Sequence, residues 1–171
     1  MSGITKHSRG NLSYSGTLTI AGKLTSEDNK ICIGSANAVI ESNAVGTYDV
    51  SDCFKAYAAN GLTDYFHISG ILPYQSMGAT PKVTSIELYV TDITAPDKVD
   101  RVRLRHADLT TGTITTDWED DDDKSGTDHT ISYTGVDITL AENCAYWIEV
   151  ALDAGGTGFH INGFGIVYDL V

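Results

Sequence analysis

The chain has 171 residues, a formal net charge of −12 and a pI of about 4.5. A domain of this length buries enough of its unfolded surface to form a core without disulfides or metal, and its acidity makes it a poor partner for nucleic acid or anionic membranes. Its apolar runs are too short for a transmembrane helix, so we expect no nucleic-acid binding and no membrane insertion.

Residues 1–45 are predicted to form an extended N-terminal arm or attachment segment, and residues 46–171 the folded domain. The arm alternates small apolar residues with polar ones and offers few large side chains, so it buries little surface by itself. We therefore expect its apolar residues to pack on a neighbour, either the main sandwich or another subunit, and we favour another subunit. These candidate intersubunit contacts are Leu12, Leu18, Ile20, Ile31 and Ile33.

The stretch over residues 51–60 is compatible with a helix, because Ser51 or Asp52 could cap it and Asn60 followed by Gly61 could end it. After it, the apolar and polar residues alternate with a period of two, which predicts half-buried strands. The predicted strands cover residues 66–68, 85–90, 101–105, 136–140, 146–152 and 165–170. Short turns rich in Gly, Asp and Thr separate them, which predicts an all-β antiparallel sandwich of jelly-roll or immunoglobulin type, of which we favour the jelly roll.

An acidic segment over residues 117–128 carries consecutive like charges from Glu119 to Asp123, which predicts an exposed loop. An alternative is a Ca²⁺ site made by Asp121, Asp123 and Ser125, which occupy alternate positions as in the first half of a calcium loop. The residue at the twelfth position is a serine rather than the bidentate glutamate of an EF-hand. Residues 120–124 also spell the recognition sequence of enteropeptidase.

We find no motif of a catalytic or cofactor site, so we expect a protein that is not an enzyme and that holds no cofactor unless the acidic segment binds calcium. The three cysteines, Cys32, Cys53 and Cys144, have no metal-binding spacing. We expect them to be small buried residues with free thiols.

The two tryptophans, Trp118 and Trp147, are candidate contacts for a glycan, because planar aromatic rings stack on sugars. If Ile148 faces the core, Trp147 points to the opposite side of its strand. The alternative for both is packing in the core or between subunits.

The run from Glu142 to Gly156, followed by residues 161–168, is an aromatic strand, a Gly-rich turn and a last apolar strand. It resembles the closing hairpin of β-sandwich domains in bacteriophage virion structural proteins, namely head-decoration and fibre proteins. The Thr/Ser/Gly segment over residues 16–20 is similar to those by which such proteins join a shaft or shell. The resemblance implies a homotrimer attached to other virion proteins.

From this resemblance we expect a virion structural protein, either a capsid decoration or a fibre component, that attaches through its N-terminal arm. The N-terminus lacks the apolar region of a secretory signal, so we expect synthesis in the host cytoplasm and a final place in the virion. The alternative function is a carbohydrate-binding module, or the receptor-binding tip of a fibre that recognises a host-surface glycan.

Overall fold

The computed structural model of the chain describes residues 4–6, 12–14, 26–34, 38–40, 45–48, 54–57, 63–69, 79–91, 93, 95–125, 129–153 and 159–171. Within these residues every regular element is a β-strand. No helix that could span a membrane occurs among them. The predicted all-β class is therefore confirmed.

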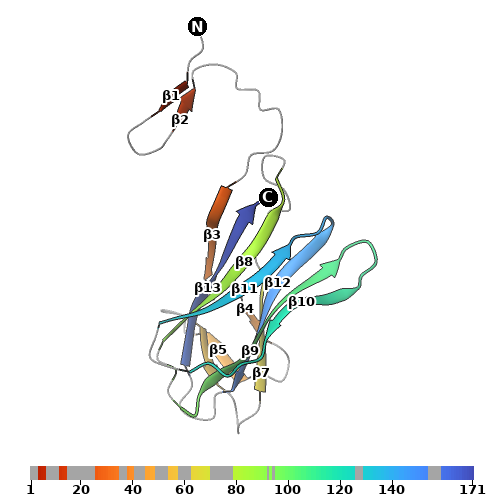
Figure 1. Cartoon of the computed structure of the whole chain (residues 1–171). Helices are drawn as coiled ribbons and strands as arrows, with labels where there is room; N and C mark the ends of the chain where they lie inside the picture. The colour runs from red at the N-terminus through yellow and green to blue at the C-terminus, as the bar shows by residue number, and fades with distance from the viewer. Residues whose placement is uncertain are drawn as a thin grey trace.

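The strands of the described ranges form three sheets, and all of the pairings between them are antiparallel (Figure 1). In chain order they are β1 (Ile4–Lys6), β2 (Leu12–Tyr14), β3 (Ser26–Gly34), β4 (Ala38–Ile40), β5 (Val45–Tyr48), β6 (Phe54–Tyr57), β7 (Thr63–Ser69), β8 (Pro81–Thr91), β9 (Lys98–Asp108), β10 (Ile114–Asp120), β11 (Thr130–Thr139), β12 (Cys144–Asp153) and β13 (Phe159–Leu170).

Two of these sheets make the sandwich. One has five strands in the order β10-β9-β12-β7-β4, and the other has the order β11-β8-β13-β6-β5 with β3 also paired to β13. From β6 to β13 each strand crosses to the other sheet, except that β9 and β10 form a hairpin within one sheet. The resulting orders, β6-β13-β8-β11 and β7-β12-β9-β10, are those of an eight-stranded jelly roll, which confirms the predicted sandwich.

The core lies between the two sheets and is built from alternate residues of the strands. On β8, Ile86 and Leu88 are at most 1% exposed, whereas the intervening Glu87 lies on the outer side. Ile148 on β12 and Phe164 on β13 are buried in the same way. Each such side chain contributes about 1.5–3 kcal/mol when it leaves water, and this fixes which face of each strand points inward.

Two strands from the range that we predicted as an arm belong to the sandwich. β4 pairs with β7, and β3 pairs with β13 so that Ile31 lies opposite Ile166 and Ile33 opposite Phe164. Ile33 packs against the core cluster and Ile31 is half-buried. Pairing with β13 directs Ile33 toward the core of its own chain, and its contact with a neighbouring subunit stays a prediction.

The other predicted intersubunit contacts remain predictions. Leu12 lies in β2, which pairs with β1 in a sheet of two strands. Leu18 and Ile20 lie outside the described residues. The domain boundary at residue 45 also stays a prediction, although residues 26–34 and 38–40 now count among the strands of the sandwich.

The stretch predicted to be compatible with a helix contains β6 instead. Phe54 pairs with Ile161 on β13 and with Tyr48 on β5, so this segment is hydrogen-bonded on both of its edges. Cap residues at either end of a short run provide only local stabilisation, and pairing with two neighbouring strands overrides it.

Candidate functional site: the outer face of the five-stranded sheet

The outward side chains of β9 and β12 form a charged network on the five-stranded sheet. Val102 and Leu104 on β9 point into the core, so the alternating Arg103 and Arg105 point outward. On β12, Glu149 lies opposite Arg103 in the strand register. We call this side of the sheet, away from the core, the outer face.

Glu149 holds the two arginines together. Its Oε1 accepts a hydrogen bond from Nη1 of Arg103 at 3.0 Å, and its Oε2 accepts one from Nη1 of Arg105 at 2.6 Å. The Glu149 side chain is only 5% exposed. On the other side, Nε of Arg103 donates to Glu119 of β10 at 2.6 Å. The four side chains therefore form one ordered network across three strands.

The charge state of this network follows from its contacts. Burial by itself would raise the pKa of Glu149, but the hydrogen bonds from Arg105 and Arg103 outweigh it and hold the pKa below its ordinary value. The pKa of Arg103 is raised, mainly by its hydrogen bond to Glu119. Glu149 is thus ionised at neutral pH, and its hydrogen bonds hold the guanidinium groups of Arg103 and Arg105 in place on the outer face.

Trp147 extends the network on β12. It lies opposite Arg105 in the register, is half-buried, and its ring centroid is 5.7 Å from Cζ of Arg105, within the range of a cation–π contact. Among the described residues, neither the indole Nε1 of Trp147 nor Nε of Arg105 has a hydrogen-bond partner. The side of Trp147 is the one expected from the sequence, because Ile148 does face the core.

Small and apolar residues continue the outer face toward the β9–β10 turn. In the register, Ile114 of β10 lies opposite Ala107 of β9, and Ala107 lies opposite Ala145 of β12. Ala145 and Ile114 are exposed, and Ala107 is half-buried. This row is next to the one that holds Arg105 and Trp147.

Trp118, the second predicted glycan contact, lies on the other side of its sheet. It packs against the core and meets the ring of Tyr133 edge-on, with 6.1 Å between centroids. A register shift between Thr116 and Trp118 accompanies this inward position. The structure therefore does not bring the two tryptophans together on one surface.

The predicted acidic loop is exposed at Glu119, Asp121, Asp122, Asp123 and Ser125, and Asp120 and Lys124 are half-buried. Residues 126–128 lie outside the described residues. The carboxylate of Asp123 accepts a hydrogen bond from Lys98 Nζ at 2.9 Å. In the part of the chain that the structure describes, no three His, Cys, Asp or Glu side chains gather as metal ligands. Calcium binding by Asp121, Asp123 and Ser125 remains a prediction from the sequence.

The cysteines differ from the expectation that all are buried. Cys32 is exposed on β3, and Cys144 is half-buried at the start of β12. Both are free thiols, and Cys53 lies outside the described residues. Cys32 is exposed because it alternates with Ile31 and Ile33, which take the inward positions on β3.

The opposite sheet carries a different cluster on its outer side. Oε2 of Glu87 accepts hydrogen bonds from Lys30 Nζ at 2.6 Å and from the Tyr89 hydroxyl at 2.7 Å. Lys30 also lies over the Tyr89 ring, 5.4 Å from its centroid. Gly165 lies beneath, and a Cβ there would be 2.7 Å from the Tyr89 hydroxyl. This glycine therefore lets Tyr89 lie close to the sheet.

Sequence reasoning singled out Trp147 but missed Glu149 as the residue that organises the arginines. A signal was present, because Trp147 and Glu149 share a face of their strand, and the three arginines at 101, 103 and 105 share a face of theirs. What the sequence does not contain is the pairing of β12 with β9, which joins residues 44 and 46 positions apart.

No family model and no curated protein matches the chain. Among solved structures it is similar to the C-terminal domain of a chitobiase from Bacteroides fragilis, with a TM-score of 0.43, 12% identity and coverage of 82% of this chain and 99% of that one. It is also similar to a family 29 carbohydrate-binding module from Piromyces equi, with a TM-score of 0.40, 8% identity and coverage of 86% and 91%. These likenesses concern the β-sandwich fold and say nothing of a ligand.

Proposed function

We propose that this protein is a carbohydrate-binding domain and that it holds its glycan on the outer face of the five-stranded sheet, at Trp147. The observation that carries the proposal is the position of Trp147, a half-buried indole on the outside of a jelly roll, beside the guanidinium of Arg105. A sugar ring has apolar C–H faces and a rim of hydroxyl groups, so it needs both kinds of contact at once.

Both kinds of contact are present within one row of the sheet. The indole of Trp147 supplies an apolar surface, and Arg105 supplies donors for hydroxyl oxygens. Glu149 fixes Arg105 through a hydrogen bond of 2.6 Å, so the donor is already oriented before any ligand arrives. An oriented donor loses less side-chain entropy on binding than a mobile one.

The experiment is binding of the purified chain to a glycan array, followed by calorimetric titration with each glycan that binds. We expect Trp147→Ala to weaken binding by about tenfold or more, which corresponds to the loss of one buried aromatic contact. Tyr89→Ala is the matched control, since Tyr89 is an aromatic residue on the outer side of the other sheet. The proposal would be overturned if the two variants lost affinity equally, or if the wild type bound no glycan on the array.

A second candidate is the virion structural role that the sequence predicts, in which the N-terminal arm attaches the domain to sister subunits and other virion proteins. The observation in its favour is that β1 and β2 form a two-stranded sheet of their own. A two-stranded hairpin is marginally stable in water and needs a further surface to pack on. The two roles are compatible, because a fibre tip can hold a glycan and still be attached by its arm.

A further inference from the structure

The outer face has a second exposed apolar contact, on the strand at its edge. Ile114 at the start of β10 is 56% exposed. Only Leu109 and Val171 join it among large apolar side chains exposed in the described part of the chain. An exposed isoleucine on a strand face leaves apolar surface in water, and a ligand that covers this surface gains the free energy of its burial.

Ile114 lies on the same face as Trp147. Residues opposite one another in neighbouring strands put their side chains on the same side of the sheet, and Ile114 is joined in this way to Ala107 and then to Ala145. Ala145 is two residues before Trp147 on β12, so it shares the face of Trp147. Alanine side chains are short, so no large side chain stands above the row of Ala145, Ala107 and Ile114, and Arg105 borders this row beside Trp147.

The separation of the two contacts sets the size of the ligand. Ile114 lies two strands away from Trp147 and one pleat repeat along the strand direction. With about 4.8 Å between strands and about 3.4 Å of rise per residue, their Cα atoms are about 12 Å apart. A single hexose ring is shorter than this distance, whereas a short oligosaccharide spans it.

The hairpin that carries Ile114 is held in a fixed shape. The carboxylate of Asp108 accepts hydrogen bonds from the backbone N–H groups of Thr110 at 2.7 Å and Thr111 at 3.2 Å. Gly112 has a φ of +73°, a conformation that glycine adopts without strain. The N–H of Leu109 donates to the carbonyl of Asn143 at 2.9 Å, which ties this turn to the neighbouring β11–β12 turn.

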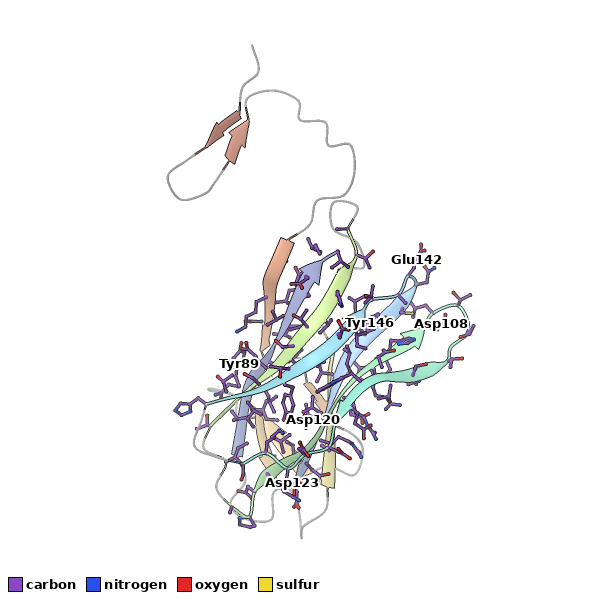
Figure 2. All side chains as sticks on the ribbon, viewed as in Figure 1. Tyr89, Asp108, Asp120, Asp123, Glu142 and Tyr146 are labelled. Carbon is purple, nitrogen blue, oxygen red and sulfur yellow. The ribbon has the colours of Figure 1, made fainter. Side chains whose placement is uncertain are left out.

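Figure 2 shows Asp108 and Glu142, from these two turns, together at one end of the sandwich. The end of the hairpin is therefore braced by a second turn, and the start of β10 has a fixed position relative to β12. Preorganisation of this kind favours the binding of an extended ligand, because little of the protein has to be ordered when it binds.

We infer that the ligand of the outer face is an oligosaccharide segment that crosses from Trp147 on β12 to Ile114 on β10, with one sugar ring at each residue and the alanine row and Thr116 between them. This inference rests on the proposed function and extends it by naming the length of the ligand and a second contact residue. Exposed Thr116, opposite Arg105 in the register, places a hydroxyl beside the path.

The test is calorimetric titration with β-1,4-linked glucose, mannose, xylose and N-acetylglucosamine series, each from the monosaccharide to the tetrasaccharide. In the series that binds, we expect affinity to rise by about tenfold or more from monosaccharide to trisaccharide. We expect Ile114→Ser to remove most of that gain, so that affinity rises little from monosaccharide to trisaccharide. Leu109→Ser is the matched control, because Leu109 is exposed on the same hairpin but lies in its turn, beyond the path.

The outcomes separate the two proposals. Suppose that Trp147→Ala abolishes binding, but that affinity depends neither on the length of the glycan nor on Ile114. This result would overturn the inference and leave the proposed function standing. No binding in any series, together with no binding on the glycan array, would overturn both. Equal losses in Ile114→Ser and Leu109→Ser would assign the effect to exposed apolar surface in general and would also overturn the inference.

Discussion

Oε2 of Glu149 lies 2.6 Å from Nη1 of Arg105, on the outer side of a sheet and with the Glu149 side chain 95% out of contact with water. The same carboxylate accepts a hydrogen bond from Arg103 at 3.0 Å. A carboxylate in this position is held ionised by its partners, and its removal leaves two guanidinium groups without their shared acceptor. Loss of Glu149 is therefore expected both to destabilise the domain and to release the two arginines on its outer face.

The first prediction concerns pH. The pKa of Glu149 in the folded chain is below its ordinary value of 4.5, because the arginine hydrogen bonds outweigh the effect of burial. A lowered pKa gives stability that is present above 4.5 and is lost as the pH falls below 4.5 through the folded-state value. We expect Glu149→Gln to lower the free energy of unfolding by about 2 kcal/mol at neutral pH. We also expect the free energy of unfolding of this variant to fall less steeply with decreasing pH than that of the wild type.

Urea unfolding of wild type and variant at neutral pH and at several pH values below 4.5 measures both effects. Glu142→Gln, at an exposed glutamate in the β11–β12 turn, is the control and should follow the wild-type curve. Parallel curves for Glu149→Gln and wild type in acid would show that the arginine network does not hold this carboxylate ionised.

The second prediction concerns the acidic segment, where residues 120–124 spell the recognition sequence of enteropeptidase and a freely exposed loop would be cut after Lys124. The backbone of Lys124 exchanges two hydrogen bonds with Val99, of 2.8 and 2.9 Å, and Asp123 is paired with Lys98. A protease needs its substrate backbone free, so we now expect the native chain to be cut slowly. Lys98→Ala should be cut several times faster and Lys98→Arg at the wild-type rate, as followed by gel electrophoresis. Fast cutting of the wild type would refute this.

The strands were predictable because their signal is local. Ile86, Leu88 and Ile148 alternate with polar neighbours, and burial of one face selects the register whatever the partner strand is. The same logic placed Trp147 outside. It failed at β6, where local cap residues favoured a helix but two partner strands were decisive. It also did not reveal that Ile33 lies opposite Phe164, which is distant in the chain.

The site was less predictable for the same reason. Arg103 and Arg105 read as a basic strand face, and Glu149 as one acidic residue among many. Their association depends on β12 lying beside β9, which is a property of the jelly-roll order. Ile114 could not be singled out from the sequence. Alternation along a strand shows which residues share a face, but it does not show which face of β10 is exposed.

The third prediction uses two glycines that face each other in the register, Gly163 on β13 and Gly34 on β3. A Cβ at Gly163 would lie 2.5 Å from the carbonyl oxygen of Ile33, so the two strands would have to move apart. A Cβ at Gly34 meets no heavy atom within 4 Å. We expect Gly163→Ala to lower stability by about 2 kcal/mol and Gly34→Ala to change it by less than about 0.5 kcal/mol. Thermal unfolding compares them, and equal melting temperatures would contradict the pairing of β3 with β13.

The last prediction separates the part of the N-terminal range that serves the sandwich from the part that is proposed to serve assembly. Deleting residues 1–25 removes β1 and β2 but leaves β3 paired with β13. We therefore expect this deletion to keep the melting temperature of the full chain while converting the proposed homotrimer to a monomer. Deleting residues 1–42 also removes β3 and β4, and it exposes the surface that Ile33 covers, so we expect it to lower stability by about 3 kcal/mol or more.

Light scattering after size-exclusion chromatography gives the mass, and thermal unfolding gives the stability of each form. The two deletions are controls for one another, since only the longer one removes strands of the sandwich. A full chain that is already monomeric, or a 1–25 deletion that retains the mass of the full chain, would remove the support for an attachment role of the arm. If the 1–42 deletion is as stable as the 1–25 deletion, the pairing of β3 with β13 adds no net stability to the sandwich.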